Sequence, residues 1–143
     1  MKGKFDRRAL KTIREGIREK YRGVAGNPEG YFRYPTGREG LEKQDYDPEV
    51  LRDLPEEILA FYCGVGNPFS LGAIPEGDSI LDIGSGAGVD SFVAATLTGP
   101  KGRVAGIDLI PEMLERARGN LKKTGLENVT FQEASAETLP FTD

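Results

Sequence analysis

ILDIGSGAGVDSFVAATLTGPKGRVAGID, residues 80–108, is the stretch that decides the fold of this chain. It opens with a short apolar run, 79–83, that is preceded and followed by glycine and is typical of a buried parallel strand. Gly84, Gly86 and Gly88 follow at alternate positions. Glycines at this spacing allow a tight turn in which the backbone can approach a ligand closely. The stretch therefore predicts a strand that leads into a ligand-binding loop.

The residues after the glycines complete a strand, helix and strand unit. Residues 91–97 have helical character, so the N–H groups and the dipole of this helix would face the loop. Residues 103–107 form a second apolar strand, and Asp108 follows at its C-terminal tip. An acid about 20 residues beyond such glycines is suited to bind ribose hydroxyls. The unit predicts a nucleotide-cofactor site rather than an ordinary strand-to-helix turn.

Two details of the loop favour S-adenosylmethionine (SAM) over NAD as the cofactor. A dinucleotide site needs a third glycine three residues after the second, and Val89 occupies that position. Asp82, just ahead of the glycines, disfavours a pyrophosphate but can help to hold a cationic aminoacyl group, directly or by ordering the loop. SAM carries an ammonium and a sulfonium and no phosphate. An NAD-linked oxidoreductase is accordingly the more distant alternative.

Length and composition limit the class of protein. The 143 residues suffice for one ordinary domain, and the 38% hydrophobic and 29% charged fractions are typical of a soluble globular protein. No apolar run approaches the roughly 20 residues that span a bilayer, and the first residues lack the apolar core of a signal peptide, so a cytoplasmic location is expected. Cys63 is the only cysteine and histidine is absent, which excludes internal disulfides, zinc clusters and histidine-based catalysis. Cys63 is expected to be a buried apolar residue, with a reactive thiol as the alternative.

The charge is distributed unevenly along the chain. The net charge is −4, yet residues 2–22 hold nine Lys and Arg against Asp6, Glu15 and Glu19. We expect this basic segment to form a solvated helix face that docks on the acidic remainder of the chain. The alternative is a basic arm that contacts nucleic acid or anionic lipid.

The N-terminal half predicts a mostly helical and irregular segment. Apolar residues recur every fourth position from Phe5 to Tyr21 and predict an amphipathic helix over 6–21. Residues 23–47 predict an irregular loop, and its aromatic side chains are expected to pack under it or, alternatively, to line a ligand pocket: Tyr31, Phe32 and Tyr34. Asp53 predicts the N-cap of a further helix over 55–62.

The C-terminal part continues the alternation of helices and strands. After Asp108 the pattern predicts a helix over 112–123 that ends at Gly125, a strand over 129–131, and a loop to the last residue. The fold class is therefore α/β, as a three-layer, Rossmann-like SAM-binding fold that stops after its third strand. We expect an N-terminal helical and loop cap over 1–75 and the first half of the SAM-binding domain over 76–143.

Residues 53–143 resemble the class I SAM-dependent methyltransferases, in particular the arsenite-methyltransferase-like branch. Four segments carry the resemblance: LPEEILAFYCGVGNP (54–68), ILDIGSGAGVDSFVAA (80–95), GRVAGIDLIPEMLERAR (102–118) and NVTFQEASAETLPF (128–141). The resemblance implies methyl transfer from SAM to a small-molecule acceptor. This sequence departs from the family pattern at two positions. Ser135 stands where the family has an acid that reaches the adenine amine, and Val65 stands where the family has a cysteine.

The resemblance also assigns the cofactor-binding residues, one position at a time. The methionine-side loop would be formed by Asp82, Gly84, Ser85, Gly86 and Gly88. Asp108 would hold the ribose, Leu109 would flank the adenine, and the backbone N–H of Ala136 would meet the adenine edge. No catalytic residue and no metal site is implied. Candidates for the acceptor side are Tyr31, Tyr34, Tyr62 and Cys63.

A complete sheet of this family has seven strands in the order 3-2-1-4-5-7-6, and this sequence supplies strands 1 to 3. The edge of strand 1 would then be open. Either the sequence is a piece of a longer methyltransferase, or it is a half-domain that a partner completes. The second explanation favours a homodimer or higher oligomer by antiparallel pairing of two copies of strand 1. Two alternatives to a methyltransferase domain follow. One is a non-catalytic SAM-binding or assembly module that a partner completes. The other, more distant, is a nucleic-acid-binding protein that uses the basic helix.

Overall fold

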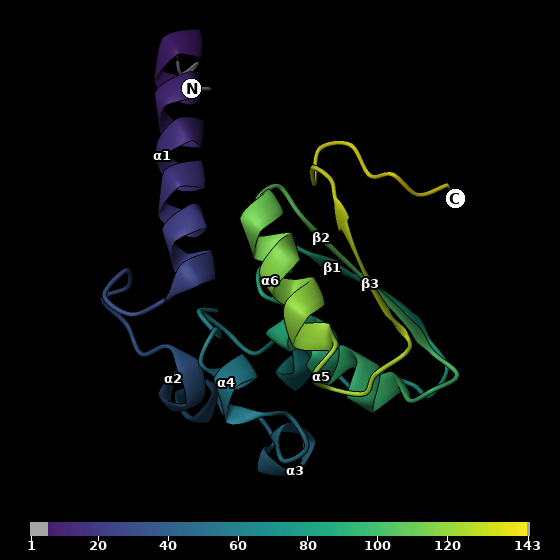
Figure 1. Ribbon diagram of the computed structural model, residues 1–143. Coiled ribbons are helices and arrows are strands. Elements are labelled where there is room, and N and C mark those ends of the chain that lie inside the picture. The colour runs from purple at the N-terminus through teal and green to yellow at the C-terminus, as the bar shows by residue number, and fades with distance from the viewer. Residues whose placement is uncertain (1–5, 143) are drawn as a thin grey trace.

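A three-stranded parallel sheet lies at the centre of the computed structural model, which describes residues 6–142 (Figure 1). The strands lie in the order β1-β2-β3 and comprise β1 (Ser79–Ile83), β2 (Arg103–Asp108) and β3 (Val129–Glu133). Leu81 lies beside Ala105, and Ala105 beside Thr130, so side chains on alternate positions share one face. The three predicted strands and their order are confirmed, with β2 and β3 extending one and two residues further.

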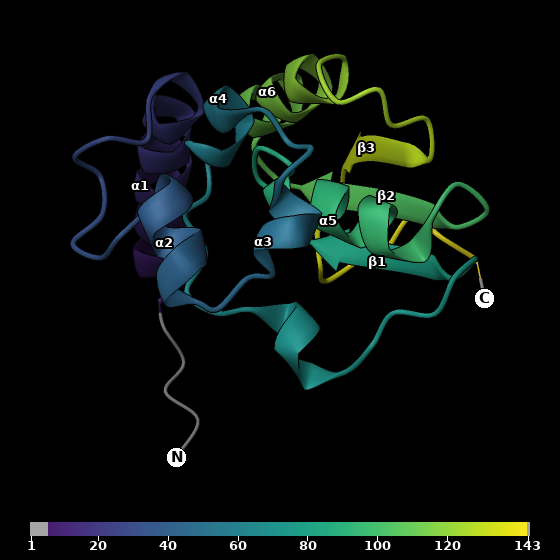
Figure 2. The same ribbon diagram turned by 90° about the horizontal axis from the view of Figure 1, so that it is seen from below.

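Two helices of the repeating unit cover one face of this sheet. α5 (Val89–Thr98) packs on all three strands, and α6 (Pro111–Leu121) packs on β2 and β3. Figure 2 shows both helices on the same side, with the C-terminal segment running past the other side. The α/β, Rossmann-like fold is confirmed. The expectation of three layers is wrong for residues 6–142, because no helix in that range covers the second face.

The N-terminal half contains more helix than its sequence predicted. Its elements are α1 (Arg7–Gly26), α2 (Gly37–Lys43), α3 (Pro48–Leu51) and α4 (Glu56–Leu59), followed by a 3₁₀ turn over Pro68–Leu71. The irregular loop expected over 23–47 is therefore wrong in part, since α1 continues to Gly26 and α2 forms within it. The helix expected over 55–62 is reduced to a single turn, and its N-cap is Pro55 rather than Asp53.

Two features explain these differences. Gly23 continues α1 because the Tyr31 side chain occupies the space where a Cβ would lie, so this glycine serves close packing rather than helix termination. Asp47 accepts a hydrogen bond from the Glu49 N–H, 2.9 Å away, and starts α3 ahead of Pro48. The continuation of α1 and the start of α3 both depend on contacts that hydrophobic periodicity alone does not show.

One hydrophobic cluster joins the N-terminal segment to the sheet unit. Fully buried side chains of the N-terminal half, including Leu41, Ile58 and Leu59, pack in the same cluster as Phe92 and Val104. Burying side chains of this size contributes roughly 1.5–3 kcal/mol each. The boundary expected at residue 75 stays a prediction, and the packing of the core extends across it.

α1 stands beside α6 and carries the basic segment (Figure 1). The Arg22 Nε atom lies 2.6 Å from the Glu112 carboxylate, and the Arg116 Nε donates a hydrogen bond to the carbonyl oxygen of Ala25 at 2.8 Å. The C-terminal half of the basic helix thus docks on the body of the protein, as expected. Lys2, Lys4 and Phe5, which the sequence assigned to this basic or apolar pattern, lie outside the described residues. Within residues 6–142 no helix combines the length and the apolar character that crossing a membrane requires.

Gly88→Ala should lower the free energy of unfolding by about 2–4 kcal/mol, as strained and overpacked substitutions do. Gly88 has a φ of 95°, and an added Cβ would lie 2.8 Å from Phe131 and 2.9 Å from Phe92. Urea denaturation followed by circular dichroism measures the effect. The matched control is Gly119→Ala on the exposed side of α6, where a Cβ meets no atom within 4 Å and helix propensity favours alanine by about 0.5–1 kcal/mol. Equal effects of the two changes would contradict this account.

Candidate functional site

The glycine loop wraps over the carboxyl end of β2. The backbone N–H groups of Gly84 and Ser85 both donate to the carbonyl oxygen of Ile107, at 2.8 and 2.9 Å. Gly84, Gly86 and Gly88 have φ values of 77°, 53° and 95°, a region that favours glycine. The loop therefore needs its glycines for conformation as well as for space.

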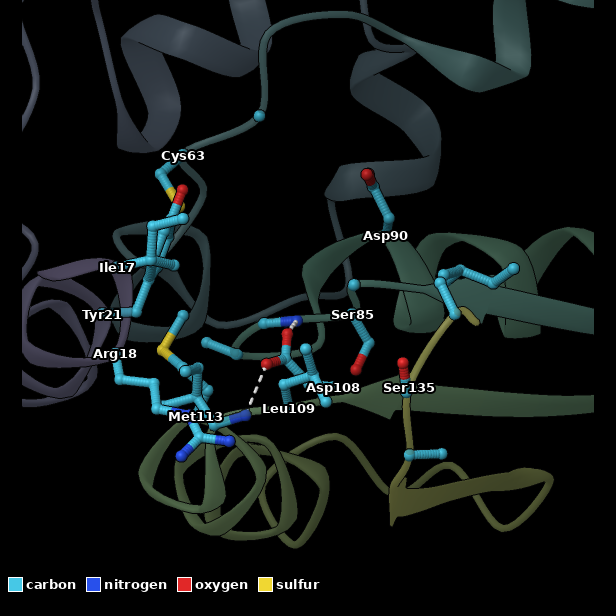
Figure 3. Close-up of a pocket in the computed structure, with 18 of the residues that line it drawn as sticks. Ile17, Arg18, Tyr21, Cys63, Ser85, Asp90, Asp108, Leu109, Met113 and Ser135 are labelled. Carbon is cyan, nitrogen blue, oxygen red and sulfur yellow. Dashed lines mark hydrogen bonds between the residues drawn. The ribbon is translucent and has the colours of Figure 1, made fainter. Parts of the chain in front are cut away.

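Asp108 ties this loop to the start of α6. One carboxylate oxygen accepts a hydrogen bond from the Gly86 N–H, and the other accepts from the Ile110 N–H, each at 2.9 Å (Figure 3). Because a carboxylate oxygen accepts more than one hydrogen bond, both atoms keep capacity toward a ligand. Asp108 thus combines a structural role with a position on the surface of the cavity described next.

A cavity of about 650 Å³ opens at the carboxyl ends of the strands. Its floor is formed by the glycine loop and by Asp108 to Ile110, and its far wall by Tyr62 and Cys63. Ligands of open α/β folds bind at this end of the sheet, in clefts of roughly 300–1,000 Å³. The position and size of the cavity make it the candidate ligand site.

The structure brings six of the eight predicted cofactor-binding residues to this cavity and leaves two outside its lining. The six are Gly84, Ser85, Gly86, Asp108, Leu109 and Ala136. Gly88 lies beneath the loop, against Phe92 and Phe131. Asp82 accepts a hydrogen bond from the buried Ser91 hydroxyl at 2.6 Å, on the side of β1 that faces α5.

The environment of Asp82 explains which of its two expected roles the geometry supports. Burial raises the pKa of the Asp82 carboxyl, and the hydrogen bond from Ser91 opposes that rise. The carboxylate joins β1 to the first turn of α5 and so holds the two ends of the glycine loop together. Asp82 is thus placed to order the loop rather than to contact a ligand directly.

Two residues that the sequence did not single out contribute to the site. Asp90, in the first turn of α5, lines the cavity and accepts a hydrogen bond from the Tyr46 hydroxyl at 2.6 Å. Asn120 of α6 is buried and donates to the carbonyl oxygen of Ala87 at 3.1 Å, which holds the loop from below. The acid at position 90 was visible in the first turn of a predicted helix. Nothing in the sequence paired it with Tyr46.

Burial gives Asp90 unusual acid–base behaviour. It raises the pKa of the Asp90 carboxyl to about 6; the hydrogen bond from Tyr46 lowers the pKa and the neighbouring Asp82 raises it. Burial also raises the pKa of the Tyr46 hydroxyl, and the charge of Asp90 adds to that rise. The pair is therefore a neutral tyrosine and a carboxylate that titrates close to neutral pH.

α1 forms the roof of the cavity. Arg14, Ile17, Arg18 and Tyr21 project toward the loop from one side of the helix, and Figure 3 shows three of them, Ile17, Arg18 and Tyr21, across from Asp108. Arg14 also lies 4.0 Å from the Glu137 carboxylate, which follows β3. The amphipathic pattern of this helix thus serves the site as well as the hydrophobic core.

The aromatic segment after α1 packs on that helix. The Phe32 ring lies 6.3 Å from Tyr21 and 5.2 Å from Tyr34, and the Lys20 ammonium lies 4.4 Å above it. The Tyr34 hydroxyl donates to the carbonyl oxygen of Cys63 at 2.9 Å. These contacts support packing under the loop, the alternative to a pocket-lining role.

Of the four residues expected on the acceptor side, Tyr62 and Cys63 reach the cavity, whereas Tyr31 and Tyr34 lie outside its lining. Cys63 is partly buried, and that burial raises the pKa of its thiol. A raised pKa favours the neutral thiol over the nucleophilic thiolate. Cys63 therefore has the character of an apolar wall residue.

The residues around the cavity fit the cofactor that the sequence predicted. Leu109 and Met113 offer apolar surface for a planar base, and Asp108 offers acceptors for ribose hydroxyls. Within residues 6–142, the Ser85 hydroxyl is the one buried side-chain polar atom without a hydrogen-bond partner, and it lies in this loop. An unpartnered buried hydroxyl is expected beside a site that a polar ligand fills.

Comparisons with known proteins find similarity to methyltransferases. Residues 74–143 match a family model described as a methyltransferase domain. The chain is 35% identical to an arsenite methyltransferase of Halobacterium salinarum, over 91% of this chain and 37% of the relative, and 35% identical to a protein-L-isoaspartate O-methyltransferase of Ignicoccus hospitalis, over 71% and 54%. A solved SAM-dependent methyltransferase of Aquifex aeolicus is 32% identical over 72% of this chain and 50% of its own, with a TM-score of 0.49. The chain therefore spans less than two thirds of each relative.

Ser91→Ala should lower the free energy of unfolding by about 1–3 kcal/mol, because it leaves the buried Asp82 carboxylate without its donor. Ser70→Ala is the control, since its hydroxyl makes an exposed hydrogen bond to the Asn67 carbonyl and its loss should cost less than about 0.5 kcal/mol. Urea denaturation measures both variants. A Ser91 variant as stable as the Ser70 variant would show that this hydrogen bond does not hold the loop.

Proposed function

We propose that this chain, whose residues 74–143 match the model of a methyltransferase domain, binds SAM in the cavity and presents its methyl group to a small-molecule acceptor. One observation carries the proposal. The segment that matches the family contains the glycine loop and Asp108, and the two hydrogen bonds of Asp108 shape that loop into the floor of the cavity.

Different residues at the floor of the cavity would contact different parts of the cofactor. Asp108 would accept hydrogen bonds from the ribose hydroxyls, Leu109 would cover the adenine, and the backbone N–H of Ala136 would meet its edge. Gly84 and Gly86 would let the methionine half lie against the backbone. SAM, when bound, supplies an electrophilic methyl group on a sulfonium.

The chain's own contribution to the reaction is positioning and exclusion of water. Ile17 and Tyr21 on the α1 roof and Met113 on α6 enclose the cavity with apolar surface. Holding two reactants in line replaces a bimolecular step by an effectively unimolecular one. Tyr62 and Cys63 form the wall on which an acceptor would rest.

The same cavity suits a second candidate function, a SAM-binding module whose acceptor site is completed by another chain. Two features favour it: β1 pairs on one edge alone within the described residues, and Leu81 and Ile83 are 37% and 52% exposed. We propose self-association through this edge, with two copies of β1 antiparallel across a two-fold axis. The cytoplasmic location expected from the sequence stays a prediction.

Asp108→Ala should weaken binding of SAM and of S-adenosylhomocysteine by about 1–3 kcal/mol, the range for removing a charged hydrogen-bond acceptor. Isothermal titration calorimetry measures the affinity, and circular dichroism checks that the variant is folded. Because Asp108 also shapes the loop, Asp108→Asn provides a second variant with a smaller structural effect. Glu115→Gln, which removes an exposed carboxylate of α6 outside the cavity lining, is the control. Unchanged affinity in a folded Asp108 variant would contradict the proposed ribose contact.

Release of labelled methyl groups from SAM in the presence of candidate acceptors separates the two functions. Turnover would support the methyltransferase, whereas tight binding without turnover across acceptor classes would support the binding module. Failure of the wild-type chain to bind either ligand would contradict both.

Leu81→Lys should shift the chain toward the monomer in sedimentation velocity experiments at micromolar concentration. A two-fold axis centred at Leu81 brings two lysines opposite each other, and like charges at that position destabilise strand pairing. Thr130→Lys on β3 is the control, because it adds the same charge to the same face at the opposite side of the sheet. A wild-type chain that sediments as a monomer throughout would refute the proposed association.

A further inference from the structure

Asp90 is the carboxylate in the cavity wall whose role the proposed function leaves unassigned. It lies in the first turn of α5, directly after the glycine loop, with its carboxylate in a largely buried environment. Figure 3 shows it on the opposite side of the cavity from Asp108 and Leu109, with Ser85 between them. A ligand whose nucleoside rests on Asp108 and Leu109 would extend its other end toward Asp90.

The hydrogen bonds of Asp90 leave one oxygen available to such a ligand. The Tyr46 hydroxyl donates to the Oδ1 atom at 2.6 Å and fixes the rotamer of the side chain. Tyr46 is itself held by an edge-on contact with Tyr62, with ring centroids 5.3 Å apart. Within residues 6–142 Asp90 takes part in no ion pair, so no protein cation neutralises it. A buried carboxylate without a cation is costly unless a ligand provides one.

The other charges around the cavity indicate which part of the ligand this is. Asp82 is turned away and bonded to Ser91, and Asp108 is occupied at the nucleoside end. Arg14 and Arg18 project from the α1 roof. Glu137, the other acid of the lining, follows Ala136 at the adenine end and lies 4.0 Å from Arg14. Asp90 is therefore the acid that remains for a cation at the end of the cavity away from the adenine.

We propose that Asp90 binds the α-ammonium group of the methionine half of the cofactor, with Tyr46 as its positioning residue. The inference rests on the proposed function, because it requires SAM to occupy this cavity. It assigns to Asp90 the direct contact with the cationic group that the sequence left as one of two roles for Asp82. The shared ammonium of SAM and S-adenosylhomocysteine, rather than the sulfonium that SAM alone carries, is the group recognised.

Three ligands test the assignment on the wild-type chain and on Asp90→Asn. SAM and S-adenosylhomocysteine both carry the ammonium, whereas 5′-methylthioadenosine keeps the adenine, the ribose and a neutral sulfur but lacks the aminoacyl group. Asp90→Asn should weaken the first two by about 10- to 100-fold and 5′-methylthioadenosine by less than about twofold. Calorimetry measures all three affinities. The substitution removes a buried charge and keeps an acceptor for Tyr46, so the variant is expected to fold.

Two further variants sharpen the test. Tyr46→Phe keeps the aromatic packing and removes the hydroxyl, and should reduce SAM affinity about three- to tenfold with little change for 5′-methylthioadenosine. Glu115→Gln, which removes an exposed carboxylate of α6 outside the cavity lining, should leave the ratio of the two affinities unchanged. Loss of SAM affinity alone would place Asp90 at the sulfonium and overturn the assignment, as would an equal loss for all three ligands. Failure of the wild-type chain to bind any of them would instead refute the proposed function.

The pH dependence of binding gives an independent readout. The groups that face Asp90 from neighbouring elements are Tyr46, Tyr62, Cys63 and Asp82, and burial raises the pKa of each of them. The contact requires an ionised Asp90, so SAM affinity should fall as the pH drops through about 6. It also requires a protonated ligand amine, so SAM affinity should fall again above about pH 8, where α-amino groups lose their proton. Asp90→Asn should flatten this profile. A wild-type profile that the substitution leaves unchanged would contradict the proposal.

Discussion

The carboxylate of Asp108 is the interaction on which the arrangement of the site depends. By accepting the N–H groups of Gly86 and Ile110, it fixes the glycine loop, the tip of β2 and the first turn of α6 relative to one another. Hydrogen bonds to an ionised acceptor are roughly twice as strong as neutral ones. Asp108, which the sequence motif assigns to ligand binding, therefore also determines the shape of the site.

Packing beneath the loop imposes the second constraint. Phe131 and Phe92 meet edge to face with centroids 5.8 Å apart, and they fill the space directly under Gly88. An added Cβ at Gly106 of β2 would also lie 2.6 Å from the Phe131 ring. At Gly88 and Gly106, the aromatic core therefore occupies the space that a side chain would need. The core and the loop cannot be varied independently.

The sheet unit could be predicted from its sequence because its signals are local. Three short apolar runs predicted the strands, and the acid at the tip of β2 predicted the position of the loop floor. The N-terminal half was predicted less well. The extension of α1 depends on Tyr31 packing over Gly23, and α2 depends on burial of Leu41 in a cluster built from distant residues. Similarly, Asp90 gains its environment from Tyr46, 44 residues away, and no spacing in the sequence encodes that hydrogen bond.

The positions of the charged side chains in the site likewise depend on both local and distant contacts. The sequence placed a carboxylate ahead of the glycines and a basic helix at the N-terminus, and it left open how each would meet a ligand. Folding turns Asp82 inward to Ser91, brings Asp90 to the wall, and places Arg14 and Arg18 of the basic helix over the cavity. Acidic groups of α5 and β2 thus face basic groups of α1 across one space. A ligand that carries a cation at the end away from its nucleoside is complementary to Asp90. A dinucleotide would instead place the negative charge of its central pyrophosphate between the carboxylates of Asp108 and Asp90.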